Sequence, residues 1–590
     1  MTLKPRASTI VEVLLGLEDL TRYGARFVDR TGNSTSYTYK EVIERAKSVA
    51  GTLQAGGLAP GDRVAIILPT SIHFLDIFLG TQLAGGIPAA LYPPVRLGRL
   101  TEYFSRTSRM ITKIGARFLV TDSRIRKLLG PAAEGAPCLE KVLDVESLRT
   151  QATFSPASPD PETPAFLQFS SGTTVEPKAV MVSHTNLLYN LEMMESFFRE
   201  YSEEDSFHGG VCWLPLYHDM GLVGCMYNGL YHPGNVTYIG PEVFIAKPRI
   251  WLQTLSKTRA VISPAPDFAY GLCLQKIKDK DMEGVDLSNW KIALNGAEPI
   301  NTETMTKFCE RFARWGFRKE AMTPVYGLAE AGLAVSFSDF RVLPLLSEFD
   351  RERLAETGQA VPGKGRILPS LGPALPGLEV EIRDEEGRPI PKGWVGKIMA
   401  KGPSITRGFY EDPETTSRMI REGWLDTGDL GFFYEGNLYI AGREKDLIII
   451  RGRNYAPQEI EEVAADVEGL RTGCTIAVSC VTEAQGEQLI VLAERDARSK
   501  RPDEEVAAEI RDRVLSGVSL TPYHVQVLDP GTLPRTSSGK MRRADALRMF
   551  LAGELLPPEK MNALKMFKEI GKSQIAWGRF WLQKRKSDTG

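Results

Sequence analysis

The chain has 590 residues, of which 43% are hydrophobic and 25% charged, and these values are typical of a soluble globular protein of several domains. Its 72 basic and 74 acidic residues give a formal charge of −2, which argues against a nucleic-acid-binding protein. The seven cysteines form no C-x-x-C pair and the six histidines no H-E-x-x-H motif, so we expect reduced thiols, a cytoplasmic protein and no zinc site. We expect neither a signal peptide nor a transmembrane segment, because no suitable apolar run is present.

Residues 1–60 are predicted to be helical, because apolar residues recur at helical spacing over 9–20 and 38–53. Strands and helices then alternate, with strands expected at 63–68, 89–92 and 117–120 and a helix at 71–83. This alternation is typical of parallel sheets connected by crossover helices. The proline-rich stretch 155–164 is predicted to be a linker.

A loop of hydroxyl side chains with one glycine and one lysine occupies residues 169–178, between the apolar runs 165–169 and 179–182. Glycine permits positive φ, so successive backbone N–H groups can face one anion. The hydroxyls add donors, and Lys178 adds a full charge. The composition favours a phosphate-binding loop, although it is no G-x-x-x-x-G-K-[ST] motif. A polar hairpin loop is the alternative.

Three later strands are predicted to end in polar turns that contain glycine, at 217–221, 295–299 and 326–330. Turns at the carboxyl ends of parallel strands form ligand crevices, whereas any one of them alone is an ordinary connection. Residues 346–370 interrupt the alternation, and 378–400 are predicted to be antiparallel. A small α+β module is expected beyond Lys445.

Five segments in this order resemble the adenylate-forming superfamily of acyl-CoA synthetases, peptide-synthetase adenylation domains and luciferases. They are residues 169–178, 326–330, 424–431, 442–446 and 534–540. Within that superfamily, residues 215–222, residues 263–270 and the insert at about 346–370 look like fatty acyl-AMP ligases.

The resemblance implies an α/β fold in two domains. A large N-terminal domain of parallel-type sheets with helices and a small antiparallel subdomain would occupy residues 1–444. A small mobile α+β domain would occupy residues 445–550 and turn about a hinge at Lys445. Residues 551–590 would form a basic C-terminal extension.

The resemblance also implies a reaction. A fatty acid would be activated with ATP and Mg²⁺ to an acyl-adenylate and pyrophosphate. The acyl group would then pass to the phosphopantetheine thiol of a holo acyl carrier protein, in lipid, polyketide or lipopeptide biosynthesis. In fatty acyl-AMP ligases the insert is thought to hinder the rotation needed for reaction with CoA. The alternatives are a medium- or long-chain acyl-CoA synthetase, an amino-acid adenylation domain, and a catalytically weakened binder of lipid or nucleotide.

By the same resemblance, several residues would bind ATP. The β- and γ-phosphates would be held by Ser171, Gly172, Thr173, Thr174 and Lys178. The adenine would be lined by Gly296, Ala297, Glu298 and Tyr326, and the ribose held by Asp429 and Arg443.

The chemistry would depend on three further residues. Glu330 would bind Mg²⁺, a hard cation that prefers oxygen ligands. His218 would flank the reacting carboxylate, and Lys540 would contact that carboxylate and the α-phosphate. The candidates for a long apolar acyl pocket are Leu222, Met226, Asp267, Phe268 and Tyr270.

Two sites depart from the family pattern. Val175 and Glu176 stand in the loop where the family runs Thr-Gly-x-Pro-Lys-Gly; valine does not easily adopt positive φ, and Glu176 adds negative charge near phosphates. Asp267 stands where acyl-AMP ligases often have asparagine.

The tail at 560–586 interleaves basic and apolar residues. We expect it to pack on the small domain with a solvated outer face. The alternative is a basic amphipathic helix that meets an anionic carrier protein or a membrane surface.

Overall fold

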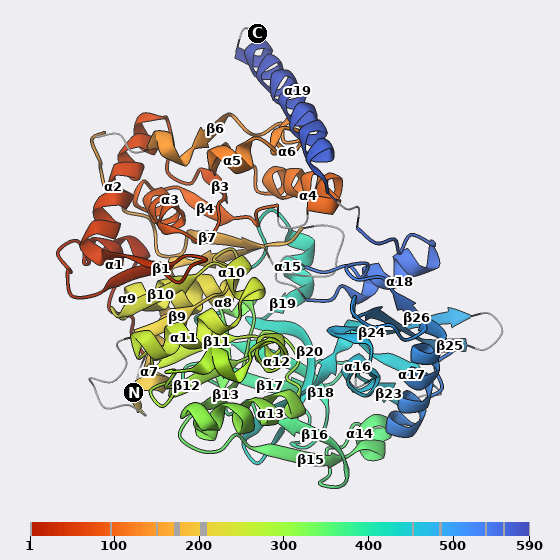
Figure 1. The fold of residues 1–590 in the computed structure, drawn as a ribbon. Helices are drawn as coiled ribbons and strands as arrows, with labels where there is room; N and C mark the ends of the chain where they lie inside the picture. Colours follow the sequence, from red (N-terminus) through yellow and green to blue (C-terminus); the bar gives the residue numbers. More distant parts are fainter. Residues whose placement is uncertain are drawn as a thin grey trace.

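The computed structural model describes ten stretches of the chain, which are residues 3–94, 97–148, 152–169, 177–200, 209–450, 453–465, 467–482, 486–536, 540–558 and 561–588. Two α/β sheets with packed helices and one antiparallel sheet form the larger N-terminal part, and a smaller domain follows (Figure 1). The predicted fold class is confirmed.

The first α/β sheet has six strands in the order β6-β5-β3-β4-β7-β8. Its strands are β3 (Arg63–Ile67), β4 (Ile87–Ala90), β5 (Phe118–Thr121), β6 (Lys141–Asp144), β7 (Pro164–Phe169) and β8 (Ala179–Ser183). All are parallel except β8, which runs antiparallel to β7. Helix α3 (Ile72–Leu83) begins after Ser71 as predicted, and nearly all of its residues are buried, among them the polar Asp76 and Gln82.

The second α/β sheet has eight strands in the order β14-β13-β12-β11-β9-β10-β1-β2. They are β1 (Gly24–Val28), β2 (Ser34–Thr38), β9 (Gly209–Cys212), β10 (Asn235–Ile239), β11 (Ile262–Ala265), β12 (Ile292–Asn295), β13 (Met322–Gly327) and β14 (Ala334–Phe337). The strands from β1 to β13 are parallel, and the two edge strands are antiparallel to their neighbours. The carboxyl ends of β9, β11, β12 and β13 therefore share one edge.

The prediction that residues 1–60 are helical is wrong for β1 and β2. Only α1 (Ile10–Leu15) and α2 (Tyr39–Ala55) are helices there. Strand β2 is largely exposed and carries no apolar alternation, so its conformation depends on pairing with β1. Helix α2 begins where expected because Thr38 and Glu41 form a capping box.

The antiparallel sheet consists of β17 (Glu379–Arg383), β18 (Gly396–Lys401), β19 (Ile420–Arg421), β20 (Trp424–Tyr434) and β21 (Asn437–Arg443). The predicted insert folds as a hairpin, β15 (Leu346–Asp350) and β16 (Gly365–Pro369), around helix α14 (Arg351–Thr357). Phe349 packs edge-on against Phe432 and Tyr439, with ring centroids 5.1 and 5.4 Å apart. This aromatic cluster fastens the insert to the antiparallel sheet.

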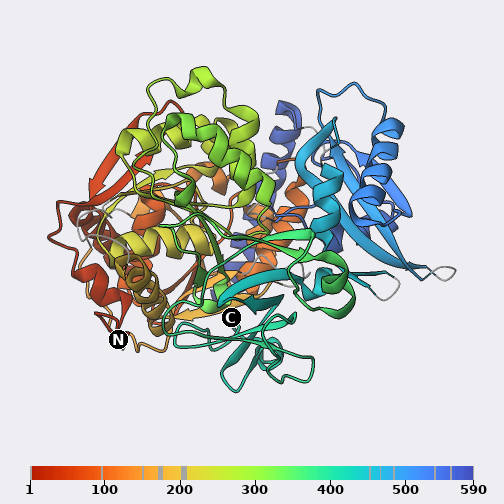
Figure 2. The ribbon, with the colours of Figure 1, turned by 90° about the horizontal axis from the view of Figure 1, so that it is seen from below.

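The smaller domain has its own apolar core. Its strands are β22 (Ile448–Ile450), β23 (Arg453–Tyr455), β24 (Leu470–Thr482), β25 (Gly486–Arg495) and β26 (His524–Leu528), and its helices are α16 (Pro457–Ala465), α17 (Asp503–Val518) and α18 (Arg543–Leu551). Figure 2 shows it beside the larger part.

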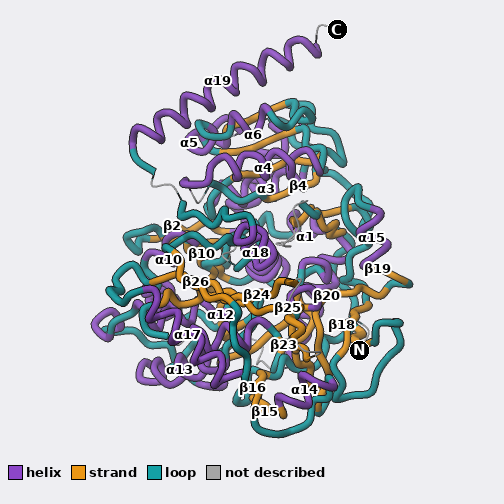
Figure 3. The backbone as a smooth tube through the Cα atoms, turned by 90° about the vertical axis from the view of Figure 1, so that its right-hand side faces the viewer, coloured by secondary structure: helices purple, strands orange, loops and turns teal. Residues whose placement is uncertain are grey.

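The tail forms one helix, α19 (Ala563–Asp588), and the prediction that it packs on the small domain is wrong. It lies instead against α6 (Gly130–Glu134) of the N-terminal domain, as Figures 1 and 3 show. The Gly130 N–H donates to the Ser573 hydroxyl at 2.8 Å, and Trp577 Nε1 donates to the Arg126 carbonyl at 3.1 Å. A Cβ at Gly130 would meet the Ser573 carbonyl oxygen at 2.1 Å, so glycine permits this close approach.

No helix in the described part of the chain is both long and apolar enough to cross a membrane. The seven cysteines are all free, and five of them are buried.

Candidate active site

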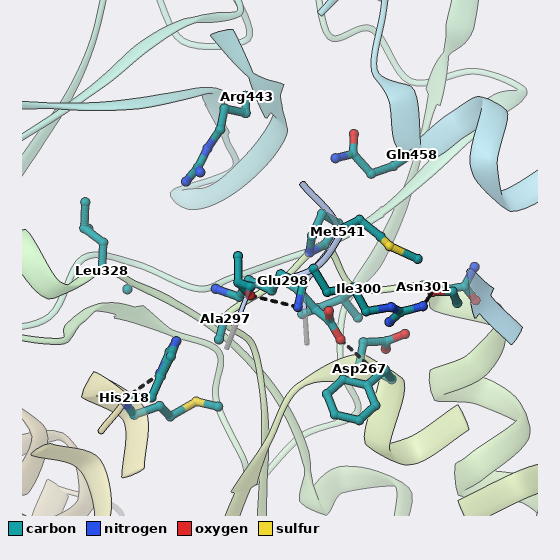
Figure 4. A pocket seen from close by; sticks show the side chains of 18 of the residues that line it. His218, Asp267, Ala297, Glu298, Ile300, Asn301, Leu328, Arg443, Gln458 and Met541 are labelled. Atoms are coloured by element: carbon teal, nitrogen blue, oxygen red, sulfur yellow. Dashed lines mark hydrogen bonds between the residues drawn. The ribbon is translucent and has the colours of Figure 1, made fainter. Parts of the chain in front are cut away.

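One cavity of about 2110 Å³ lies where the carboxyl ends of the second sheet, the antiparallel sheet and the small domain meet. Figure 4 shows His218, Ala297, Glu298 and Asp267 on one wall, and Arg443 and Gln458 on the opposite side. Three of the strand-end turns predicted from sequence thus face one space.

Of the five residues expected to hold phosphates, only Lys178 lies among the described residues. Ser171, Gly172, Thr173 and Thr174 lie outside the described residues, as do Val175 and Glu176 of the same loop. Lys178 follows them directly and lines the cavity, with its Nζ 5.8 Å from the centre of the Phe409 ring. Burial lowers the pKa of Lys178, and the positive charges of Lys445 and Arg418 lower it further. Three cations around one polar space form a site for a polyanion.

Asp429 holds a fixed position on the opposite wall. The Tyr326 hydroxyl donates to its Oδ2 at 2.8 Å, and Arg443 Nε donates to its Oδ1 at 2.9 Å. Strands β20 and β21 place Asp429 and Arg443 directly opposite each other, and β13 supplies Tyr326. Each carboxylate oxygen has further lone pairs, so Asp429 can accept bonds from a ligand's hydroxyls.

The turn after β12 brings backbone close to this wall. Ala297 has a φ of +65°, an uncommon conformation for a residue other than glycine. A Cβ at Gly296 would meet the Val325 carbonyl oxygen at 2.6 Å, so glycine permits the close packing of the turn on β13. Glu298 Oε1 accepts a bond from the Phe268 N–H at 2.7 Å, and burial raises the pKa of Glu298.

His218 precedes the short helix α8 (Asp219–Gly221), and its Nδ1 lies 2.6 Å from Asp219 Oδ1. Burial acts to raise the pKa of Asp219, but the charge and hydrogen bond of His218 and the charge of Lys540 outweigh it, and the pKa falls to about 2. Asp219 therefore stays ionised and orients the imidazole. Burial raises the pKa of nearby Glu330, and the negative charge of Asp219 adds to the effect.

Lys540 enters the same cavity from the small domain. Burial lowers its pKa, whereas the charges of Asp219 and Glu298 act in the opposite direction. Its backbone is joined to that of Thr536, because the Lys540 N–H donates to Thr536 Oγ1 at 3.0 Å and the Thr536 N–H donates to the Lys540 carbonyl at 2.8 Å. One lysine of the small domain thus meets several carboxylates of the large one.

The five candidates for the acyl pocket divide into two groups. Asp267 and Phe268 line the cavity. Burial raises the pKa of Asp267 well above its usual range, and its Oδ1 accepts a bond from Asn295 Nδ2 at 3.0 Å. Leu222, Met226 and Tyr270 belong to the fully buried core, where the Tyr270 hydroxyl donates to the Leu294 carbonyl at 3.0 Å.

A comparison with protein families matches residues 20–410 to AMP-binding enzymes. The chain belongs to the AMP-binding enzyme family.

Relatives of this AMP-binding enzyme match it over most of its length. JamA of Moorena producens, named a medium-chain-fatty-acid–[acyl-carrier-protein] ligase, is 34% identical over 552 residues that cover 88% of this chain and 90% of that protein. A Caulobacter vibrioides protein provisionally named an acyl-CoA synthetase is 34% identical over 526 residues, which cover 87% and 90%. A solved structure from a study of fatty acyl-adenylate ligases of E. coli and L. pneumophila has a TM-score of 0.87 and 33% identity, and the match covers 93% of this chain and 99% of that one.

Sequence reasoning assigned no role to some residues of this AMP-binding enzyme that line the cavity. Asp219 directly follows His218 in a strand-end turn, and that position was the signal for it. An apolar wall of the cavity consists of Met194, Phe198, Gly224, Leu333 and Phe337. Helix α7 (His184–Glu200) supplies the first two, the π-helix η3 (Leu222–Tyr227) supplies Gly224, and β14 with the residue before it supplies the last two. No short motif joins these residues, because three separate elements supply them.

Proposed function

We propose that this AMP-binding enzyme activates a fatty acid with ATP and passes the acyl group to the phosphopantetheine thiol of a holo acyl carrier protein. The observation that carries the proposal is that one cavity is lined by a cluster of cations, an apolar wall and a lysine from the small domain. The same cavity is lined by Asp429, a carboxylate positioned to accept bonds from ribose hydroxyls. The names of JamA and of the fatty acyl-adenylate ligases support the substrate class and the acceptor.

In the first step an oxygen of the fatty-acid carboxylate attacks the α-phosphorus of ATP. The new acyl–phosphate bond forms as the bond to the β-phosphate oxygen breaks, and pyrophosphate leaves. Phosphoryl transfer depends mainly on positioning and charge stabilisation. Lys540 is proposed to offset the charge of the two anions, and Lys178 with Lys445 and Arg418 to hold the other phosphates.

The nucleoside is proposed to bind between the strand ends. Asp429 would accept bonds from the ribose hydroxyls, because Tyr326 and Arg443 already fix its orientation. Ala297, Glu298 and Tyr326, which line the cavity, would line the adenine. Gly296 does not line the cavity, and its part would be to let the turn pack closely on β13.

The residues present fit a bound Mg²⁺. Glu330 is a buried carboxylate whose pKa is raised by burial and by the charge of Asp219, so a cation beside it would relieve an unfavourable negative charge. The described residues include no group of three or more side chains able to hold a metal by themselves, so phosphate oxygens of ATP would complete the coordination. Bound Mg²⁺ would supply charge neutralisation on the phosphates.

The acyl chain is proposed to follow the apolar wall that begins beside His218. Gly224 faces this wall, since a Cβ there would meet Leu333 Cδ2 at 3.1 Å. The Phe198 and Phe337 rings lie 5.7 Å apart further along it. His218, oriented by Asp219, would then flank the carboxylate at the mouth of the pocket.

In the second step the thiol sulfur attacks the acyl carbonyl carbon, a thioester forms, AMP leaves and the thiol proton is released. We propose that residues 445–550 turn about Lys445 between the steps, and that the insert limits the turn. Glu459 of α16 lies 3.0 Å from Arg366 and 3.8 Å from Arg351, both in the insert. The Arg366 and Glu459 side chains are nearly buried, so removing either one would leave the other charge buried without its partner. Because the reaction needs ATP and a carrier protein, we place it in the cytoplasm.

A screen of fatty acids from short to long chain for ATP-dependent pyrophosphate release tests the first step. We expect release with a defined range of chain lengths and trapped acyl-adenylate in the absence of acceptor. Pyrophosphate release that does not require added fatty acid would contradict the proposal. No release with any of the acids would contradict it as well. The second candidate function is acyl-CoA synthesis, which the name of the Caulobacter relative favours.

A further inference from the structure

Helix α19 carries apolar side chains on two opposite faces. The inward face docks on the N-terminal domain through Ser573, Ala576 and Phe580, which are buried. The outward face carries Leu564, Phe567, Ile575 and Leu582, which are 60–80% exposed. With 3.6 residues per turn, the spacing of these four places them on one side of the helix, opposite Ser573 and Phe580.

Cations border this outward face. The helix contains seven lysine and arginine residues but only two acidic ones, Glu569 and Asp588. Lys568 and Lys572 lie on one flank of the apolar stripe and Arg585 on the other, and all three are exposed. A solvated helix face is normally polar, and an exposed apolar stripe of this length marks an interaction site.

We propose that the outward face of α19 binds an anionic lipid surface, with the stripe inserted among the headgroups and the flanking cations facing the phosphates. A basic helix with leucine and phenylalanine on its apolar face has the composition of interfacial helices. A second copy of the chain would bring Lys568, Lys572 and Arg585 against their own counterparts, which disfavours a dimer through this face. Figures 1 and 3 show α19 on the outer boundary of the molecule, with no other element above it.

The docked state makes the surface ready for use. The Gly130–Ser573 bond holds the helix on α6, and the Trp577–Arg126 bond holds it on α5 (Ser123–Arg126), so the outward side needs no rearrangement to meet a membrane. Such contact would bring the cavity to a surface in which fatty acids are dissolved. The inference is independent of the acyl acceptor and of the cavity residues.

The test is co-sedimentation of the full chain with vesicles of phosphatidylcholine alone or with about one-third phosphatidylglycerol. We expect binding to the anionic vesicles that weakens between about 0.1 M and 0.5 M salt. A Phe567→Ser/Leu582→Ser variant should lose at least about tenfold in partition coefficient, since two apolar side chains leave the lipid. A Lys568→Gln/Arg585→Gln variant should lose binding to the anionic vesicles, and its behaviour with phosphatidylcholine vesicles should match that of the wild type.

The matched control is Leu343→Ser/Leu515→Ser, which removes two side chains of similar exposure, 59% and 52%, elsewhere on the surface and should bind like wild type. Trp581 gives a second readout, because brominated anionic lipids should quench more tryptophan emission in the wild type than in Trp581→Phe, which keeps the other seven tryptophans. Adenylate formation from a short-chain acid checks that each variant is folded. Failure of the wild type to bind anionic vesicles overturns the proposal. A dimer that is lost in Phe567→Ser/Leu582→Ser, or binding to an acidic carrier protein without binding to vesicles, overturns it as well.

Discussion

Replacing Lys540 by methionine should abolish most of the first step while leaving the fold intact. Methionine keeps the approximate length of the side chain and removes its charge. An ammonium about 4 Å from a phosphate oxygen contributes about 4 kcal/mol at an effective dielectric constant of about 20. At about 1.4 kcal/mol per factor of ten, the loss corresponds to about a thousandfold in rate. The neighbouring carboxylates Asp219 and Glu298 would also lose their cation, so the KM for ATP should rise too.

The assay is pyrophosphate release with ATP and a preferred fatty acid, with thermal unfolding as a check on folding. Lys500→Met, at an exposed position of the small domain, is the matched control and should retain wild-type rates. Because burial lowers the pKa of Lys540, kcat/KM should fall on the alkaline side at a pH below 10.5, and Lys540→Arg should move this limb upward. Wild-type adenylate formation by Lys540→Met would refute the role of this charge.

Four further results are expected. Gly224→Val should abolish activity with long acids and spare short ones, because the added side chain narrows the pocket at Leu333. If Gly271→Val, and not Gly224→Val, caused this loss, the acyl chain would lie near Phe268. Val175→Gly should lower the KM for ATP by up to about tenfold in steady-state assays, since valine disfavours positive φ; an unchanged KM would show that the loop does not need it. Glu459→Gln should raise acyl-CoA formation and leave adenylate formation unchanged, and unaltered CoA turnover would remove this contact from acceptor choice. His184, whose pKa burial lowers to about 4, should make urea stability fall by about 3 kcal/mol from pH 6.5 to 4, because only the unfolded state gains the proton; a pH dependence equally steep in His184→Asn would contradict this.

The parts of the fold that local chemistry determines were predictable. Helix α2 was predictable because Thr38 and Glu41 cap it, and α3 because a long, mainly apolar segment follows Ser71. The strand-end turns that hold His218 and Tyr326 were predictable because polar, glycine-containing segments follow buried strands. Such signals lie within a few residues of one another.

Features that depend on distant partners were not predictable. Strand β2 has an exposed sequence and exists through its pairing with β1. The docking site of α19 depends on Gly130, more than four hundred residues earlier, and no periodicity reports which surface a helix covers. The apolar wall of the cavity was not predictable for the same reason, since α7, η3 and the segment of β14 each supply only one or two of its residues. Leu222 and Met226 lie in the core, because the apolar character that made them pocket candidates is shared by core residues.

The acyl acceptor provides the most direct test of the account. Purified enzyme, ATP, Mg²⁺ and a preferred fatty acid would be incubated in parallel with CoA and with a holo acyl carrier protein, and the rates of thioester formation compared. We expect rapid adenylate formation in both reactions, with faster transfer of the acyl group to the carrier protein than to CoA. Acyl-CoA formation as fast as transfer to the carrier protein would contradict it.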